Sequence, residues 1–156
     1  MRPRGFTLIE LVITLAIIGL LTTAALPLAQ LVAKREKEAE LRAGLREIRS
    51  ALDAYRFASR TGHIKQEVGD SGYPPDLKAL YEGVEDEANP NKMNMYFLRR
   101  LPRDPFFPDG TVPADQTWGL RSYQSPADNP QPGDDVFDVY SLSDGVGIDG
   151  RPYREW

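Results

Sequence analysis

The chain has 156 residues, a formal net charge of −4 and no cysteine. It has room for one modest domain, and the lack of cysteine excludes disulfides, thiol nucleophiles and cysteine-ligated zinc. Residues 61–156 carry nine basic and seventeen acidic side chains. Because phosphates select basic surfaces, this acidic part argues against a nucleic-acid partner.

The N-terminal third contains a long uncharged run. Glu10 is the only ionisable side chain between residues 6 and 33, and Leu11–Ala33 spans 23 residues. As a helix this run would be about 35 Å long, enough to cross a bilayer. Arg2 and Arg4 precede it, which favours a cytoplasmic N-terminus. A lone carboxylate in such a run needs a partner, so Glu10 is a functional candidate; the alternative is that it reaches the lipid headgroups.

A cleaved secretory signal is the other interpretation of this run. Such a signal has an apolar core of about 7–15 residues, followed by a cleavage site of small residues. The run here is longer, and nothing polar separates it from the helical pattern that follows. A retained membrane anchor is therefore favoured.

Residues 4–11, Arg-Gly-Phe-Thr-Leu-Ile-Glu-Leu, resemble the class III signal of the type IV prepilin family. In that family, prepilin peptidase cuts after the glycine and methylates the new N-terminal phenylalanine. The resemblance implies a leader of residues 1–5, a cut between Gly5 and Phe6, and N-methylation of Phe6. It also implies that Glu10 pairs with the new amine of its own or a neighbouring subunit, which would offset the cost of burying both charges.

The helical pattern continues beyond the apolar run. An apolar stripe recurs at steps of three and four: Leu41, Leu45, Ile48, Leu52 and Tyr55. This spacing predicts one helix from about Phe6 to Ser59, with a transmembrane and assembly part at 6–33 and an amphipathic part at 34–60. We expect the stripe to pack against the rest of the chain, a coiled-coil seam being the alternative. Pro27 cannot donate a backbone hydrogen bond, so a kink or a locally melted turn is expected there.

Residues 61–156 are predicted to form a globular head with a variable loop and a short antiparallel β-sheet. The whole chain is then of the α+β class, with the long helix packed on the sheet. His63, the sole histidine, is expected in a surface loop after the helix. The other expected elements are a short helix at Asp76–Glu82 capped by Asp76, a helical turn at Met95–Leu98, strands at Trp118–Tyr123 and Val136–Ser141, a further strand pair around Thr111, and a hairpin loop at Ser125–Gly133.

The segment 99–106, Arg-Arg-Leu-Pro-Arg-Asp-Pro-Phe, is a second landmark. It resembles the Arg-Leu-Pro-x-Asp-Pro-aromatic segment of the major pseudopilins of type II secretion. The matching residues are Arg100, Leu101, Pro102, Asp104, Pro105 and Phe106, together with Leu52, Asp53 and Tyr55 on the helix and Tyr73 and Pro74 after it. The resemblance implies a pilin-like fold.

The segment 141–150 places two aspartates in a glycine-rich loop. Calcium takes six to eight oxygen ligands, and glycines let a loop wrap closely, although Asp-Gly is also common in ordinary turns. Major pseudopilins bind calcium in this region, and they end in a tryptophan, as this sequence does at Trp156. The resemblance implies calcium ligands at Asp144 and Asp149.

This loop departs from the family pattern in two ways. The gap from leucine to aspartate is one residue shorter, and Asp149 stands alone where the family has an aspartate pair. The backbone carbonyls of Leu142 and Val146 would then have to contribute more to a calcium site. Further candidate ligands are Asp134, Asp135 and Asp138.

The resemblance implies a structural subunit of a type II secretion pseudopilus, a filament that spans the periplasm and helps to drive protein export. Its partners would be further copies of itself, minor pseudopilins, prepilin peptidase, the inner-membrane secretion platform and the lipid bilayer. It would cross the bacterial inner membrane once, with a periplasmic head. A type IV pilus or competence pilin is the first alternative, and an adhesive minor tip subunit is the second. An enzyme is not expected, because no set of base and nucleophile is visible.

Overall fold

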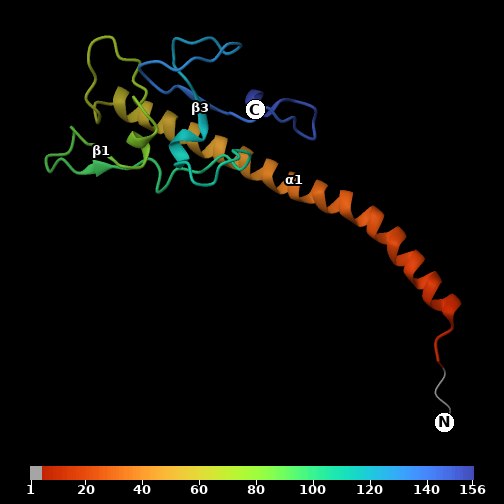
Figure 1. Cartoon of the computed structure of the whole chain (residues 1–156). Coiled ribbons are helices and arrows are strands. Elements are labelled where there is room, and N and C mark those ends of the chain that lie inside the picture. Colours follow the sequence, from red (N-terminus) through yellow and green to blue (C-terminus); the bar gives the residue numbers. More distant parts are fainter. Residues whose placement is uncertain (1–4) are drawn as a thin grey trace. The chain divides into compact units, whose positions relative to one another are not determined.

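The computed structural model describes residues 5–156. The chain divides into two compact units, Met1–Lys37 and Glu38–Trp156. One helix of 53 residues, α1 (Leu8–Arg60), runs through both (Figure 1). It ends where Gly62 takes a positive φ of 82°, and the amides of Gly62 and His63 donate to the carbonyls of Ser59 and Ala58. These two bonds form a glycine-based helix stop. The predicted helix from Phe6 to Ser59 is confirmed within two residues.

Helix α1 continues through Pro27 without interruption. The locally melted turn expected at this residue is therefore wrong for this structure. A proline removes only one backbone hydrogen bond of the ladder, and the helical bonds on either side of it can hold the turn. The kink at Pro27 stays a prediction.

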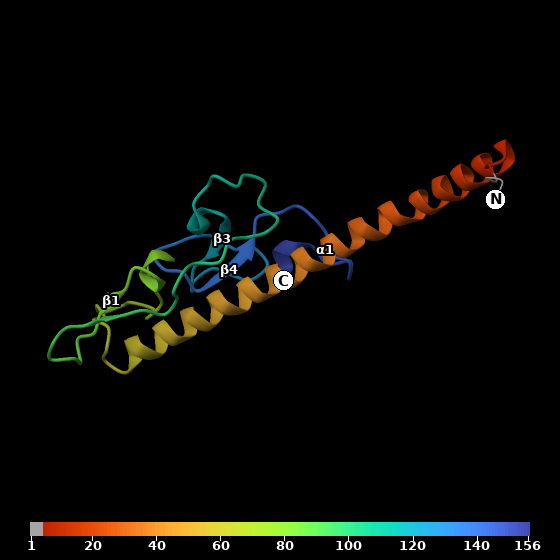
Figure 2. The ribbon, with the colours of Figure 1, turned by 90° about the horizontal axis from the view of Figure 1, so that it is seen from below.

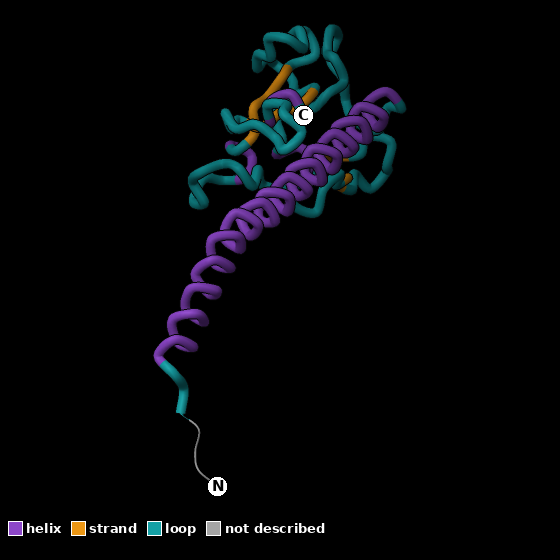
Figure 3. Tube along the Cα trace, turned by 90° about the vertical axis from the view of Figure 1, so that its right-hand side faces the viewer, coloured by secondary structure: helices purple, strands orange, loops and turns teal. Residues whose placement is uncertain are grey.

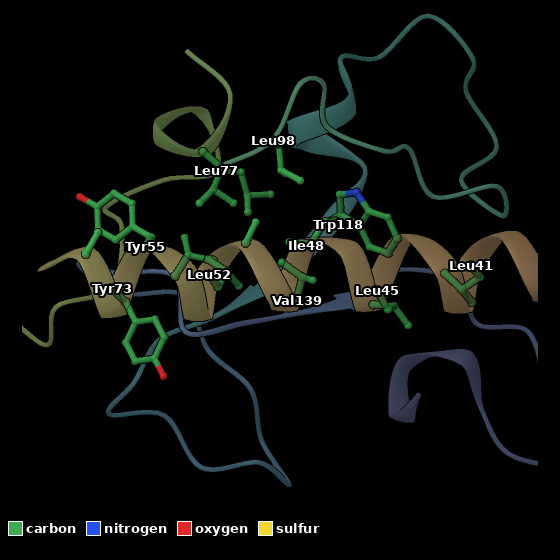
Figure 4. Close-up of a cluster of buried hydrophobic side chains, with 14 of the residues drawn as sticks. Leu41, Leu45, Ile48, Leu52, Tyr55, Tyr73, Leu77, Leu98, Trp118 and Val139 are labelled. Carbon is green, nitrogen blue, oxygen red and sulfur yellow. The ribbon is translucent and has the colours of Figure 1, made fainter. Parts of the chain in front are cut away.

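The apolar stripe of α1 forms one wall of the core of the second unit. All five of its members are buried, with Leu41 and Ile48 completely inaccessible. Figure 4 shows the stripe facing side chains from the later part of the chain, among them Leu77, Trp118 and Val139. The stripe therefore packs on the chain's own head, as predicted, and this face is not left over for a coiled-coil seam.

Gly44 lies within this stripe and allows a close approach. A Cβ atom added to Gly44 would lie 3.5 Å from the Trp118 ring and 3.6 Å from Pro102 Cβ. The Trp118 indole nitrogen also donates to the Pro102 carbonyl at 2.9 Å. A glycine in the middle of a helix costs roughly 1 kcal/mol relative to alanine. Here it gives the indole room to lie against the helix.

Two small antiparallel sheets complete the second unit. Strand β1 (Val84–Glu85) pairs with β2 (Asn94–Met95), and β3 (Trp118–Arg121) pairs with β4 (Asp138–Ser141) in the register Trp118↔Ser141. Short 3₁₀ helices occur at Lys78–Leu80, Ala114–Gln116 and Tyr153–Glu155. Figure 2 shows β3 and β4 beside the C-terminal half of α1, and Figure 3 shows the strands, in orange, around that half of the helix. The predicted α+β class and the two longer strands are confirmed.

Three local predictions were wrong. Residues 95–98 form no helical turn: Met95 pairs with Val84, and the amides of Phe97 and Leu98 both donate to the Leu80 carbonyl. No strand forms at Thr111, because its amide and hydroxyl both bond to the Asp109 carboxylate in a turn. The helix predicted at Asp76–Glu82 is only the 3₁₀ turn Lys78–Leu80, although the Asp76 carboxylate does accept the Ala79 amide as a cap would.

Candidate functional site

The first part of α1 presents its apolar side chains to the surroundings. Leu8, the first residue of α1, is 81% exposed, and Phe6 just before the helix is 89% exposed. Within the described residues, this part of α1 is long and apolar enough to cross a membrane, and none of its most apolar stretch is buried in the chain. Apolar surface of this extent is normally covered by lipid or by another protein. The segment therefore fits a membrane anchor.

Glu10 and Thr7 form a capping box at the start of α1. The Thr7 amide and hydroxyl both donate to Glu10 Oε2 at 2.8 Å, and the Glu10 amide donates back to Thr7 Oγ1 at 3.3 Å. Reciprocal bonds of this kind satisfy amides that have no partner in the first helical turn. Glu10 thus has a structural role before any second subunit is considered, and this role follows from the Thr-x-x-Glu spacing.

Gly5 has no steric reason to be glycine. A Cβ atom at this position would meet no other atom within 4 Å, and Gly5 is not among the residues with positive φ. Residues 1–4, with Arg2, Arg4 and most of the predicted leader, lie outside the described residues. The cut after Gly5 by a peptidase stays a prediction.

The second landmark, residues 99–106, is fixed by a buried carboxylate. Asp104 is 1% exposed, and it accepts the Phe106 amide at 2.8 Å and the Ser141 hydroxyl at 2.6 Å. The Asp104 amide in turn donates to Thr117 Oγ1. Asp104 therefore ties this segment to the start of β3 and to the end of β4. The sequence marked it only through the family resemblance.

The C-terminal loop, residues 142–152, leads from β4 to the last 3₁₀ helix. It closes on itself: the Gly147 amide donates to the Arg151 carbonyl at 2.8 Å, and the Tyr153 amide donates to the Gly145 carbonyl at 3.0 Å. A single β-bridge joins Val146 to Pro152. These backbone bonds define the shape of the loop.

The carboxylate of Asp149 in this loop forms ion pairs with two arginines. Its carboxylate accepts the Arg151 amide at 3.1 Å and the Arg151 guanidinium at 3.0 Å, and it lies 3.7 Å from the Arg42 guanidinium of α1. These hydrogen bonds and charges hold the pKa of the Asp149 carboxyl below its usual range, the Arg151 amide contributing most. Asp149 is therefore an ion-pair partner in this structure.

In the described part of the chain, the predicted calcium ligands do not belong to a cluster of acidic side chains. Within residues 5–156, no three acidic or histidine side chains lie close enough together to share a metal ion. Two of the further candidates bond elsewhere: Asp135 accepts the Tyr123 amide, and Asp138 pairs with Arg49 and Arg121. Calcium at Asp144, Asp149 and the carbonyls of Leu142 and Val146 stays a prediction.

Sequence reasoning missed Glu38, which contacts the loop from α1. Glu38 is 4% exposed, and its Oε1 accepts the Ile148 amide at 2.8 Å and the Tyr153 hydroxyl at 3.0 Å. A signal for it was present, because Glu38 lies three residues before Leu41 and so shares a helix face with the apolar stripe. An acid on a buried helix face calls for partners from elsewhere in the chain.

The histidine differs in part from its prediction. His63 does lie in the turn after α1, and its side chain is 43% exposed. However, its Nδ1 lies 2.9 Å from Asp86 Oδ1, and its carbonyl accepts the Glu87 amide. His63 therefore joins the end of α1 to the segment after β1.

Comparisons with known proteins agree with the two landmarks. Residues 1–26 match the model of the prokaryotic N-terminal methylation motif. The chain is similar to type II secretion system core protein G of Vibrio cholerae serotype O1, with 27% identity over 96% of this chain and 84% of that protein. No solved structure matches the chain significantly.

Two further relatives carry the same name. Core protein G of Pectobacterium carotovorum is 32% identical over 69% of this chain, and that of Dickeya chrysanthemi is 29% identical over 67% of it. The chain spans 65% and 64% of the lengths of these two relatives. Together, the methylation motif, these similarities and the α+β fold support a place for this chain among the major pseudopilins of type II secretion.

Proposed function

We propose that this chain is the structural subunit of a type II secretion pseudopilus, a filament that spans the periplasm and helps to drive protein export. The observation that carries the proposal is the exposed apolar face of the first part of α1, which contains a single acid, Glu10. Such a helix needs lipid before assembly and the helices of other subunits after it.

Processing would give the Glu10 carboxylate a positively charged partner. Prepilin peptidase would cut between Gly5 and Phe6 and methylate Phe6, leaving a positive amine four residues before Glu10. In the unprocessed chain, the amide and the hydroxyl of Thr7 both donate to the Glu10 carboxylate. A full positive charge in an apolar surrounding would bind the carboxylate more strongly than these neutral donors. The amine of a neighbouring subunit could serve equally well, and this would set the register of assembly.

The proposed location is the bacterial inner membrane, with α1 crossing once. Arg2 and Arg4 would keep the N-terminus cytoplasmic until cleavage, and the acidic head from residue 61 onwards would lie in the periplasm. Repetition of one head-to-tail contact with a rotation that does not close gives a helical filament. Minor pseudopilins and the inner-membrane secretion platform are the further partners that this role requires.

A type IV pilus or competence pilin would use the same N-terminal segment. The position of Asp104 favours the pseudopilin, because the Arg-Leu-Pro-x-Asp-Pro segment is built into the core of the head through Ser141. The similarity of the chain to core protein G over most of its length supports the same choice.

Processing and assembly can be tested in one strain that expresses prepilin peptidase. Mass spectrometry of the membrane-extracted protein should find residues 6–156 with one added methyl group. Glu10→Gln should be processed but should enter sheared filaments much less than the wild type. The matched control is Thr14→Val, which changes an uncharged polar group in the same exposed segment and should assemble normally. An uncut chain, or equal assembly of Glu10→Gln and wild type, would contradict the proposal.

A further inference from the structure

We propose that Glu38 and the ion pairs of Asp149 attach the C-terminal loop of this chain to α1. These groups stabilise the loop in place of the calcium ion that the family resemblance implies. The inference concerns how the head is held together, and it goes beyond assembly and export.

Glu38 provides the negative charge at the centre of this attachment. Its carboxylate is 4% exposed and accepts two hydrogen bonds on Oε1, one from the Ile148 amide and one from the Tyr153 hydroxyl. A buried charge is tolerated only when donors replace the lost water. Both donors come from the C-terminal loop and the helix after it, more than a hundred residues away in sequence. The loop and the helix after it therefore supply the hydrogen-bond donors that the buried Glu38 carboxylate needs, and the same bonds attach the loop to α1.

The charge around Asp149 is already balanced by protein groups. The Arg151 guanidinium bonds to it at 3.0 Å, and the Arg42 guanidinium lies 3.7 Å away. A divalent cation bound to the same carboxylate would stand beside two fixed positive charges. The family's second aspartate, which would have offset this repulsion, is absent from the sequence after Asp149.

Aromatic contacts hold the loop from its other side. The Tyr153 ring stacks on Phe106 with ring centroids 4.1 Å apart, and the Trp156 ring meets Tyr153 edge to face at 5.0 Å. The Arg42 guanidinium lies over the Trp156 ring at 4.1 Å. Arg42 thus contacts both Asp149 and Trp156, so one side chain of α1 holds both ends of this region. Such contacts stabilise the packing beyond the surface area that they bury.

Gly147 shows how closely these groups pack. A Cβ atom at Gly147 would lie 2.4 Å from the Trp156 ring and 2.6 Å from the Asp149 carboxylate. A side chain at Gly147 would therefore displace both the indole and the carboxylate.

The test is the thermal unfolding of the full chain in detergent micelles, followed by tryptophan fluorescence in excess calcium and in excess chelator. We expect the two melting temperatures of the wild type to agree within about 1 °C, because a ligand stabilises only the state that binds it. A calcium-dependent rise of about 3 °C or more, the size expected for a domain that binds calcium well below the added concentration, would overturn the proposal. This comparison needs no variant and holds whatever the variants do.

Variants then locate the attachment. Glu38→Ala should lower the melting temperature by several degrees, and Glu38→Gln, which keeps an acceptor oxygen, should recover part of the loss. Glu40→Ala is the control, because Glu40 lies on the same helix but is exposed. Equal melting temperatures for Glu38→Ala and Glu40→Ala would contradict the role of Glu38.

A direct probe for an ion site is terbium(III), which takes oxygen ligands as calcium does and is excited through a nearby indole. Trp156 lies beside Asp149, so an ion there would give sensitised emission that calcium removes. We expect no such emission from the wild type, whereas emission that calcium removes and Asp149→Asn abolishes would overturn the proposal. None of these measurements depends on filament assembly. A result that overturns the calcium-free attachment would therefore leave the proposed function unaffected, and a failure of filament assembly would leave the attachment unaffected.

Discussion

The buried carboxylate of Asp104 accepts a hydrogen bond of 2.6 Å from the hydroxyl of Ser141. Asp104 belongs to the Arg-Leu-Pro-x-Asp-Pro segment, and Ser141 is the last residue of β4, directly before the C-terminal loop. The two segments by which the sequence resembles the major pseudopilins are therefore joined by one bond. We infer that they form a single structural unit of the head.

This bond gives a prediction on stability. Asp104→Ala should lower the free energy of unfolding by about 2–4 kcal/mol, because it leaves the Phe106 amide and the Ser141 hydroxyl without their acceptor in a buried site. Ser141→Ala should cost about 1–2 kcal/mol by the same reasoning. Denaturant unfolding in detergent measures both.

The double variant tests whether the two residues act together. The double variant should lose about 1 kcal/mol less free energy of unfolding than the sum of the losses of the two single variants, since each single variant already removes the same hydrogen bond. Asp128→Ala, at an exposed position, is the control and should change little. Fully additive losses would show that the pair does not act as a unit.

Gly119 in β3 gives a second prediction. A Cβ atom at this position would lie 2.3 Å from the ring of Tyr140, its partner across the sheet. Gly119→Ala should therefore destabilise the head by about 1–3 kcal/mol through forced displacement of the ring. Gly110→Ala is the matched control, because a Cβ atom there meets nothing within 4 Å. If both variants had the same melting temperature, the close packing of Tyr140 on Gly119 would be disproved.

Tyr153 gives a prediction on pH. Burial, assisted by the hydrogen bond to Glu38, raises the pKa of Tyr153 to about 12, above its ordinary value of about 10. The folded state therefore keeps this proton more strongly than the unfolded state, so the stabilisation is complete below about pH 10 and is lost as the pH rises towards 12. In Tyr153→Phe this loss should vanish.

The measurement is the difference in free energy of unfolding between the wild type and Tyr153→Phe at several values of pH. That difference should be constant near neutral pH and shrink above about pH 10. A difference that stays constant up to pH 11, or one that grows, would be inconsistent with a raised pKa.

Gly5 separates processing from folding. Gly5→Leu should block the proposed cleavage, because a bulky side chain would have to enter the active site of the peptidase. The same change should leave the unfolding of the head unaltered, since a Cβ atom at Gly5 touches nothing within 4 Å. Mass spectrometry and thermal unfolding of the same preparation test both statements, and normal processing of Gly5→Leu would count against the assigned cleavage site.

Local patterns predicted the helical part of the fold well. The steps of three and four from Leu41 to Tyr55 placed the buried face of α1, and the glycine at 62 lies where the helix stops. Strands β3 and β4 were recognisable because their β-branched and aromatic residues are bounded by turn residues. Such signals act within a few residues, so a single sequence contains them.

Pairings between distant segments could not be predicted in this way. The hairpin of β1 and β2 has only two residues in each strand, too few for a period to show. The bond from Ile148 to Glu38 joins positions 110 residues apart, and only an acid on the apolar stripe hinted at it. The calcium prediction considered the acids of the loop and took no account of Arg42 and Arg151, which lie beside Asp149 in the structure.

The most direct test of the central claim is a deletion of this gene in its own host, complemented with the wild type or with Glu10→Ala. We expect the deletion to abolish the appearance of exported proteins in the culture medium, the wild type to restore it, and Glu10→Ala to fail although its head folds. Normal export by the deletion strain, with loss of surface pili or of DNA uptake in its place, would contradict the assignment and identify the chain as a pilus subunit.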